Sequence, residues 1–266
     1  MNFTDKITIF FRSFLLQAGW NYMRFQSIGF TFVMLPYLRK IYKKKDLRPV
    51  LTRYLENFNT HPVMASYAYG ALARMEKDDV ASQTFKRSEW TITKVFMMSS
   101  LASIGDRLFW DTLRPLAFIV ALLSAVLLHM DLFKYSHRVN LGLTEAMAAA
   151  AIYLLVYNVP AFIIRWKGLS LGYKSDSDDC YGLLAFDWNK TIRLLKLAGF
   201  ICTLAVVACT LAGQFLYLNL DVEFLLLASV LLFFIMFSFL ADKINVPVVY
   251  VYIITTVLFS AAVLIL

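Results

Sequence analysis

The stretch IGDRLFWDTLRP, from Ile104 to Pro115, decides how the rest of the chain is interpreted. An apolar run long enough to enter a bilayer follows it directly. A charge at membrane depth costs at least about 2.5 to 3.5 kcal/mol on insertion scales, so charged residues here need a partner or a function. The charged residues of the stretch surround Phe109 and Trp110 and are Asp106, Arg107, Asp111 and Arg114.

Helical spacing supplies partners for three of these four charges. Arg107 and Asp111 are four residues apart and Asp111 and Arg114 are three apart, so they can pair on one face of a helix. One interpretation is therefore a salt-bridged helix end at the membrane interface, with Trp110 as an interfacial anchor. This pairing leaves Asp106 without an explanation, which keeps a binding role open for it.

The composition is that of an integral membrane protein. Hydrophobic residues make up 60% of the 266 residues, the mean hydropathy is +0.64, and only 17% of the residues are charged. An average soluble domain has about a quarter charged residues. The formal net charge of +8 fits basic cytoplasmic loops better than nucleic-acid binding. The three cysteines form no CxxC pair and are interpreted as packing residues of a reduced compartment.

The start of the N-terminal half is predicted to be helical without spanning the membrane. Residues Phe3 to Leu16 have apolar groups at helical spacing and predict an amphipathic helix on the membrane surface. Residues Tyr22 to Leu38 predict an interfacial or protein-buried helix, because polar residues interrupt this apolar run. No cleavable signal peptide is expected, because charged residues interrupt the first apolar patch.

A polar break divides the next part of the chain. Residues Leu47 to Phe58 predict an amphipathic helix, and Val63 to Met75 predict a second apolar helix. Between them, Asn59-Thr60-His61-Pro62 stops the first helix, because the residue before a proline disfavours helical geometry. Residues Glu76 to Glu89 are then expected to form a hydrophilic loop.

The apolar segment from Trp90 to Trp110 is expected to be broken in its second half by serines, Gly105 and Asp106. Breaks at membrane depth are tolerated only where protein or a water-filled cavity covers the freed backbone groups. Two interrupted segments in one half of a membrane protein therefore point to a binding site.

The C-terminal half predicts transmembrane helices, each close to the roughly 20 residues that cross a bilayer. The fold class is an all-α polytopic membrane protein, with interfacial and re-entrant or broken helices in residues 1–114 and about five transmembrane spans in residues 115–266. The predicted spans are Pro115 to Met130, Ala146 to Ile164, Leu197 to Leu218, Phe224 to Ala241 and Val246 to Leu266.

Basic residues suggest which loops face the cytoplasm. The loop predicted at Arg165 to Lys196 is rich in Lys and Arg, and it is placed inside with the N-terminal region, which puts the C-terminus outside. Residues Arg39 to Arg48 form a second basic cluster. We interpret it as a solvated cytoplasmic loop in contact with anionic lipid rather than as a dedicated partner site.

The usual catalytic arrangements are absent from the sequence. The three histidines show no metal-ligand spacing, and neither a Gly-rich phosphate loop nor a GxSxG turn occurs. We therefore expect no metal, no cofactor and no enzyme acting by itself. His61, beside Pro62, could titrate in a site, but we interpret it as a turn histidine without a partner.

The two interrupted segments together hold residue types that suit a sugar. Sugar hydroxyls need hydrogen-bond donors and acceptors, and the apolar side of the ring needs an aromatic face. Asn59 and Thr60 from one segment and Asp106 and Trp110 from the other supply this set. The alternative is that these polar residues only cap helix ends.

Three collinear motifs resemble the IID component of the mannose, fructose and sorbose family of sugar permeases, which belongs to the bacterial phosphoenolpyruvate-dependent phosphotransferase system. The segment RWKGLSLGY at 165–173 resembles the family more weakly. The three motifs are RSFLLQAGWNYMRFQSIGFTFVMLPYLRKIY at 12–42, RYLENFNTHP at 53–62 and IGDRLFWDTLRP at 104–115.

The resemblance implies a transport subunit of the bacterial cytoplasmic (inner) membrane that crosses it several times. Such a subunit pairs with a polytopic IIC partner to translocate a hexose, and soluble IIA and IIB or fused IIAB components phosphorylate the sugar. The implied architecture is an elevator-type transporter with re-entrant elements, assembled as a trimer of IIC and IID pairs. Phosphoryl transfer is expected on the partner components.

The resemblance also implies roles for individual residues. Those that line or shape the sugar path are Asn59, Thr60, Asp106, Trp110 and Arg114. Those that pack against IIC or the core are Gln17, Trp20, Asn21 and Gln26.

The chain departs from the family pattern at Ser99 and Ser100, where the family usually has a Gly-Pro pair, and in a shorter region before the last two predicted spans. It also departs at two charged positions, because the family usually has a small residue in place of Arg107 and Gly in place of Asp111. These two residues can form a compensating pair, or they can fill the site. The second possibility leaves an alternative function open, namely a transport-inactive scaffold or regulatory membrane subunit of a phosphotransferase complex.

Overall fold

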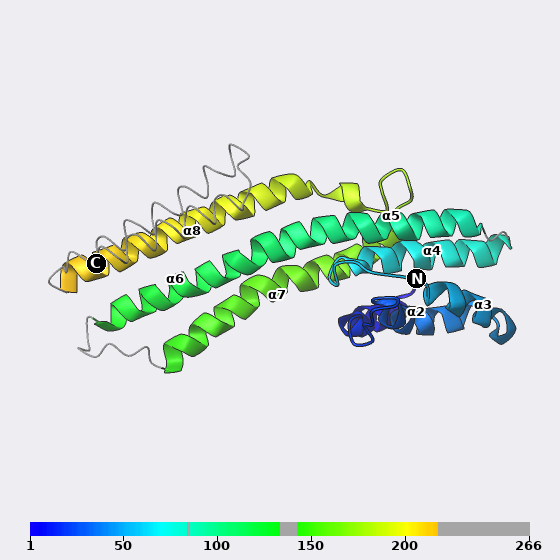
Figure 1. Cartoon of the computed structure of the whole chain (residues 1–266), viewed down its shortest axis with the longest axis horizontal. Coiled ribbons are helices and arrows are strands. Elements are labelled where there is room, and N and C mark those ends of the chain that lie inside the picture. The colour runs from blue at the N-terminus through cyan, green and yellow to red at the C-terminus, as the bar shows by residue number, and fades with distance from the viewer. Residues whose placement is uncertain (84–85, 134–142, 218–266) are drawn as a thin grey trace. The chain divides into compact units, whose positions relative to one another are not determined.

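The computed structural model describes residues 1–83, 86–133 and 143–217, and these residues are mainly helical (Figure 1). Two isolated β-bridges are the only extended pairing within the described residues. The helices are α1 (Phe3–Arg12), α2 (Ser27–Ile41), α3 (Lys44–Tyr54), α4 (Ala65–Ser82), α5 (Arg87–Gly105), α6 (Arg114–Phe133), α7 (Leu143–Lys174) and α8 (Trp188–Tyr217), with short 3₁₀ turns η1 (Ser13–Leu15) and η3 (Leu183–Ala185) and a π-helical segment η2 (Asp106–Leu113).

Three helical stretches of the described residues are long and apolar enough to cross a membrane: Arg87–Leu128, Leu143–Lys174 and Trp188–Cys209. They overlap the first three predicted spans. The other two predicted spans, at 224–241 and 246–266, lie outside the described residues.

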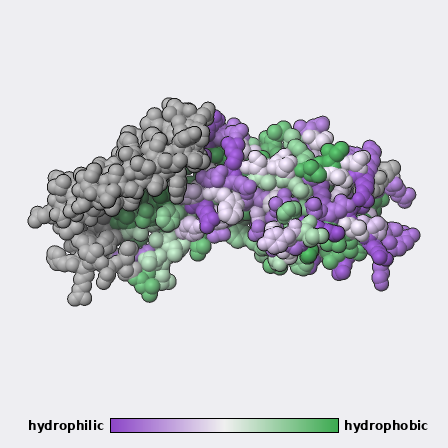
Figure 2. Space-filling model, viewed as in Figure 1, coloured by the Kyte–Doolittle hydropathy of each residue, from purple (hydrophilic) through white to green (hydrophobic). Residues whose placement is uncertain are grey.

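The chain divides into two compact units. Among the described residues, unit 1 consists of residues 1–118 and 150–199, and unit 2 of residues 119–133, 143–149 and 200–217. The division predicted from the sequence, at residues 114 and 115, stays a prediction. On the face shown in Figure 2, the hydrophilic residues of unit 1 include those at the end that carries α3.

The predicted break near Gly105 is not an interruption of the helix. The chain stays helical from α5 through η2 into α6, but η2 winds with the wider π-helical turn. The Thr112 hydroxyl donates to the Arg107 carbonyl oxygen, five residues back, over 2.7 Å. The wider turn buries Leu108, Phe109, Thr112 and Leu113 on one side and leaves the four charged residues exposed on the other.

The N-terminal helices pack around an aromatic core. Phe30 of α2 stacks on Phe58, Tyr54 and Tyr69, with ring centroids 3.9, 5.3 and 5.4 Å away. α2 is therefore the protein-buried helix among the two forms expected for it. The helix continues through Pro36, which removes one N–H from its hydrogen-bond ladder, and ends at Ile41.

The hydrophilic loop predicted at residues 76–89 is wrong for most of its length, because α4 continues to Ser82 and α5 begins at Arg87. Glu76 is fully buried. Its carboxylate accepts hydrogen bonds from the Arg53 guanidinium, from Tyr42 Oη (2.6 Å) and from Trp90 Nε1 (2.8 Å). We call Tyr42, Arg53, Glu76 and Trp90 the Glu76 cluster.

Glycines bring α4 and α7 into close backbone contact. A Cβ atom on Gly70 would collide with the Leu169 carbonyl oxygen, and one on Gly172 would collide with the Tyr67 carbonyl oxygen. Gly168 lies against the Tyr67 ring, so two glycines four residues apart allow this face of α7 to approach α4.

The loop predicted from Arg165 to Lys196 is also wrong at both ends, because α7 runs to Lys174 and α8 starts at Trp188. Arg165 is only 6% exposed, and its Nη1 donates to the carbonyl oxygen and hydroxyl of Ser13 at 2.9 and 2.8 Å. The charged side chain of Arg165 is therefore buried inside unit 1.

Candidate functional site

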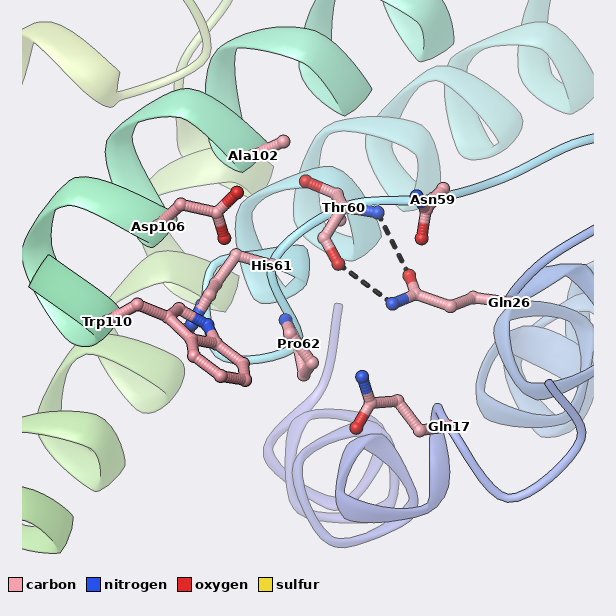
Figure 3. Close-up of a pocket in the computed structure, with 9 residues that line it drawn as sticks. All are labelled: Gln17, Gln26, Asn59, Thr60, His61, Pro62, Ala102, Asp106 and Trp110. Atoms are coloured by element: carbon pink, nitrogen blue, oxygen red, sulfur yellow. Dashed lines mark hydrogen bonds between the residues drawn. The ribbon is translucent and has the colours of Figure 1, made fainter. Parts of the chain in front are cut away.

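A pocket of about 430 Å³ opens at the surface of unit 1, where the break before α4 faces the junction of α5 and η2 (Figure 3). Both interrupted segments of the sequence contribute to it, together with the region between η1 and α2. The lining residues are Gln17, Gln26, Asn59, Thr60, His61, Pro62, Ala102, Asp106 and Trp110.

Gln26 fixes the polar segment at residues 58–60 in place. Its backbone N–H donates to the Phe58 carbonyl oxygen over 2.8 Å. Its side-chain Nε2 donates to the Thr60 carbonyl oxygen (2.9 Å), and its Oε1 accepts from the Thr60 N–H (3.0 Å), as the dashed lines in Figure 3 mark. Because Gln26 is 2% exposed, these bonds are shielded from water.

The same segment also contacts α5 and η2. The Thr60 hydroxyl donates to the Met98 carbonyl oxygen of α5 over 3.0 Å. The His61 ring stacks on Phe109 of η2, with centroids 4.7 Å apart and planes 11° from parallel. Gly105 permits this approach, because a Cβ there would collide with the His61 side chain.

His61 is 4% exposed, and its Nδ1 has no hydrogen-bond partner among the described residues. Burial, and secondarily the positive charge of Arg165, lowers the pKa of His61 from 6.5 to about 4. The imidazole is therefore neutral at physiological pH. A neutral histidine has one ring N–H to donate and one ring nitrogen to accept.

Asp106 and Trp110 face the pocket from η2, one π-helical turn apart (Figure 3). The Asp106 carboxylate forms no hydrogen bond or ion pair with another described residue, and Trp110 is 53% exposed. The Arg114 guanidinium lies 5.4 Å from the centroid of that ring. Arg114 itself is not among the lining residues, so it supports Trp110 rather than the pocket surface.

The charge pairs expected within η2 do not form. The ion pairs of the described residues include neither Arg107 with Asp111 nor Asp111 with Arg114. Arg107 instead donates from Nη1 to Asn189 Oδ1 over 3.3 Å. The physical reason is the wider winding of η2, because pairing at three- and four-residue spacing assumes an α-helix.

Four of the residues expected to line the sugar path, Asn59, Thr60, Asp106 and Trp110, surround one pocket. Gln17 and Gln26, which were expected to pack, also line it.

Trp20 and Asn21 lie elsewhere, in the tight turn before α2. Asn21 pairs with Phe25 through two backbone hydrogen bonds of 2.8 and 3.0 Å, and the Trp20 ring meets the edge of Tyr22.

His61, Pro62 and Ala102 also line the pocket, although none of them was assigned to the site from the sequence, and His61 was expected only to be a turn residue. Its place between Thr60 and Pro62 in the polar break is the signal that could have found it.

The pocket offers binding groups rather than a reactive set. Amide, hydroxyl, carboxylate and indole groups converge on it, and these suit a neutral polyhydroxyl ligand. The part of the chain that the structure describes holds no group of three or more His, Cys, Asp or Glu side chains placed to bind a metal ion.

Comparison with known proteins identifies relatives of the region that carries the pocket. Residues 2–129 match the family model for the IID component of the PTS system mannose/fructose/sorbose family. The mannose-specific EIID component of Escherichia coli (strain K12) is 27% identical over 172 residues, which cover 64% of this chain and 55% of that protein.

Two further relatives give the same picture. The sorbose-specific EIID component of Klebsiella pneumoniae is 30% identical over 171 residues (64% of this chain, 56% of that protein), and the fructose permease IID component of Bacillus subtilis (strain 168) is 29% identical over 167 residues (62% and 54%). The chain spans about half the length of the curated relatives it matches.

Two solved structures share the fold. One is described only as a membrane protein, with a TM-score of 0.62, 24% identity and coverage of 77% of this chain and 70% of the other. The other is the cryo-EM structure of the mannose transporter ManYZ in complex with microcin E492, with a TM-score of 0.55, 24% identity and coverage of 78% and 70%.

Proposed function

We propose that this chain is a IID-type membrane subunit that forms a hexose translocation pathway with a IIC partner, because residues 2–129 match the model of the mannose/fructose/sorbose IID family and curated IID components are similar in sequence. Uptake is coupled to phosphorylation of the sugar by IIA and IIB, or by a fused IIAB. The complex is a trimer of IIC and IID pairs in the bacterial cytoplasmic membrane. Three apolar helices of spanning length support the membrane location.

The observation that carries this proposal is that the polar break before α4 and the junction of α5 with η2 converge on one polar pocket. Its volume of about 430 Å³ lies within the range of small-molecule sites. The polar side chains can bond sugar hydroxyls, while the exposed face of Trp110 suits the apolar side of a pyranose ring. No charged donor is needed for a neutral sugar.

The polar groups of the pocket have distinct roles in this proposal. Asp106 accepts hydrogen bonds from sugar hydroxyls, because its carboxylate has no other partner among the described residues. Asn59 supplies both a donor and an acceptor from an exposed side chain. Gln26 and Thr60 act as positioning residues, since their hydrogen bonds hold the segment that carries Asn59.

The pocket is open to the surface, which supports a partner that completes it. A translocation pathway must surround its substrate, and this chain supplies one side of the pocket only. In the proposed complex the IIC subunit covers the open side and adds further contacts to the sugar.

The test is sugar uptake by the reconstituted IIC and IID pair together with its phosphotransfer components. Asp106→Asn and Asn59→Ala are each expected to reduce uptake about tenfold or more, because each removes contacts to hydroxyl groups. Asp111→Asn is the matched control, since it removes an equal charge from an exposed residue of η2 outside the pocket. Unchanged uptake in both pocket variants would reject the site.

The transport-inactive alternative required Arg107 and Asp111 to fill the site. Neither residue lines the pocket, and Arg107 is bonded to Asn189. Sugar binding by the unaltered IIC and IID pair would reject the alternative. Binding that appears only after Arg107→Ala and Asp111→Gly would support it.

A further inference from the structure

A second pocket of unit 1, of about 360 Å³, lies between the C-terminal half of α4 and the end of α7. The close glycine packing of these two helices fixes its shape. The lining residues are Arg74, Lys77 and Asp78 from α4, and Tyr173 and Lys174 from α7.

Positive charge exceeds negative charge in this pocket. Arg74 has its own partners, because its Nε lies 3.3 Å from Asp78 Oδ2 and its Nη1 donates to the Lys174 carbonyl oxygen over 2.8 Å. The ammonium groups of Lys77 and Lys174 form no ion pair with any other described residue. Two positive charges therefore lack a counter-ion.

A third ammonium group, that of Lys6 in α1, adds to this excess. Its Nζ lies 3.6 Å from the centroid of the Trp166 ring of α7. The pKa of Lys6 is lowered by burial first and by the charge of Lys174 second, so the two cations are close enough to repel each other.

The carboxylates that follow Lys174 are engaged within their own loop. Asp176 Oδ1 accepts the backbone N–H of Asp178 over 3.2 Å, and Asp179 Oδ1 accepts that of Gly182 over 3.1 Å. These bonds favour a role in shaping the loop over a role as counter-ions for the pocket.

The pocket lies at one end of a candidate membrane span, since α7 is long and apolar enough to cross a bilayer and ends at Lys174. Lipid headgroups lie at the level of such helix ends, and anionic headgroups attract Lys and Arg there. We propose that this pocket binds the phosphate group of an anionic phospholipid between Lys77 and Lys174. The site is separate from the sugar pocket and does not depend on the proposed transport.

The experiment is native mass spectrometry of the full chain in detergent, titrated with phosphatidylglycerol or with zwitterionic phosphatidylcholine. The unaltered chain is expected to retain phosphatidylglycerol preferentially. The double variant Lys77→Gln/Lys174→Gln is expected to weaken this binding about tenfold, because each basic residue contributes to attraction of the headgroup. Circular dichroism verifies that the variant is folded.

The matched control is Lys190→Gln/Lys196→Gln, which removes the same charge from two exposed lysines of α8 outside the pocket. It is expected to leave phosphatidylglycerol binding unchanged. Equal losses in both double variants, or equal retention of the two lipids, would overturn the proposal. A thermal stabilisation by inorganic phosphate as large as that by phosphatidylglycerol would overturn the lipid assignment and identify a free phosphate site.

Discussion

The Glu76 cluster and the pocket beside Asp106 both bring polar side chains of distant segments together in unit 1, and they differ in how far those side chains are satisfied. Both oxygens of the buried Glu76 carboxylate accept hydrogen bonds. The Asp106 carboxylate, in contrast, faces an open pocket without a partner among the described residues. A closed network of this kind stabilises the fold, whereas unused donors and acceptors at a surface pocket are available to a ligand.

The largest effect is expected at the closed cluster. Glu76→Ala removes the carboxylate that the buried Arg53 guanidinium bonds, so the free energy of unfolding should fall by about 3–5 kcal/mol. Denaturant unfolding in detergent, followed by tryptophan fluorescence, measures this. Asp106→Asn should change the same free energy by less than about 0.5 kcal/mol, because Asp106 is exposed. Comparable losses in the two variants would contradict the distinction between the clusters.

His61 makes the stability of the folded chain depend on pH. Its pKa is about 4 in the folded chain and 6.5 when unfolded, so the unfolded chain binds more protons between these values. Stability is therefore lost as the pH falls from 6.5 towards 4, by up to about 3 kcal/mol. Unfolding free energies measured at several pH values should show this slope. His61→Gln should abolish it while other titrating groups are unchanged, and a slope that persists in the variant would assign the effect elsewhere.

Gln26 tests the hydrogen bonds that shape the pocket. Gln26→Ala removes both side-chain bonds to the Thr60 backbone and leaves a buried N–H without its acceptor, so we expect a loss of about 1–3 kcal/mol and reduced sugar uptake. Gln26→Glu should lose at least as much stability, because its buried carboxylate still accepts from the Thr60 N–H but faces the Thr60 carbonyl oxygen without a donor. Uptake that is unchanged in Gln26→Ala would show that the segment needs no such support.

The sequence identified both halves of the pocket because their signals are local. The polar residues Asn59-Thr60-His61 before Pro62 favour an interruption of the helix, and a carboxylate in an apolar segment needs an explanation. The resemblance to the family singled out Gln17 and Gln26 as well, but it implied that they pack against IIC or the core. Thr60 and Gln26 are 34 residues apart, so no local pattern could predict that they bond.

The predictions of solvated loops were wrong where a hydrogen-bond partner far away in the sequence holds a charged residue in the interior. The run Glu76 to Asp79 has the composition of a solvated loop, but Arg53 of α3 and Trp90 of α5 draw Glu76 into the interior. Arg165 was likewise expected in a solvated loop, but its hydrogen bonds to Ser13 hold it in the interior. In η2, the winding itself could not be predicted, and it changes which residues share a face.

The smallest effect is expected at Arg114. Its substitution tests whether this residue contacts the ligand or only supports a residue that does. Arg114→Ala removes a cation–π contact with Trp110, at 5.4 Å, and should lower the free energy of unfolding by about 0.5–1 kcal/mol. Sugar uptake should fall only slightly, since Arg114 does not line the pocket. Trp110→Ala, which removes the exposed aromatic face, should reduce uptake far more. If Arg114→Ala reduces uptake as strongly as Trp110→Ala, the guanidinium itself contacts the sugar and the pocket extends further along η2 than its present lining.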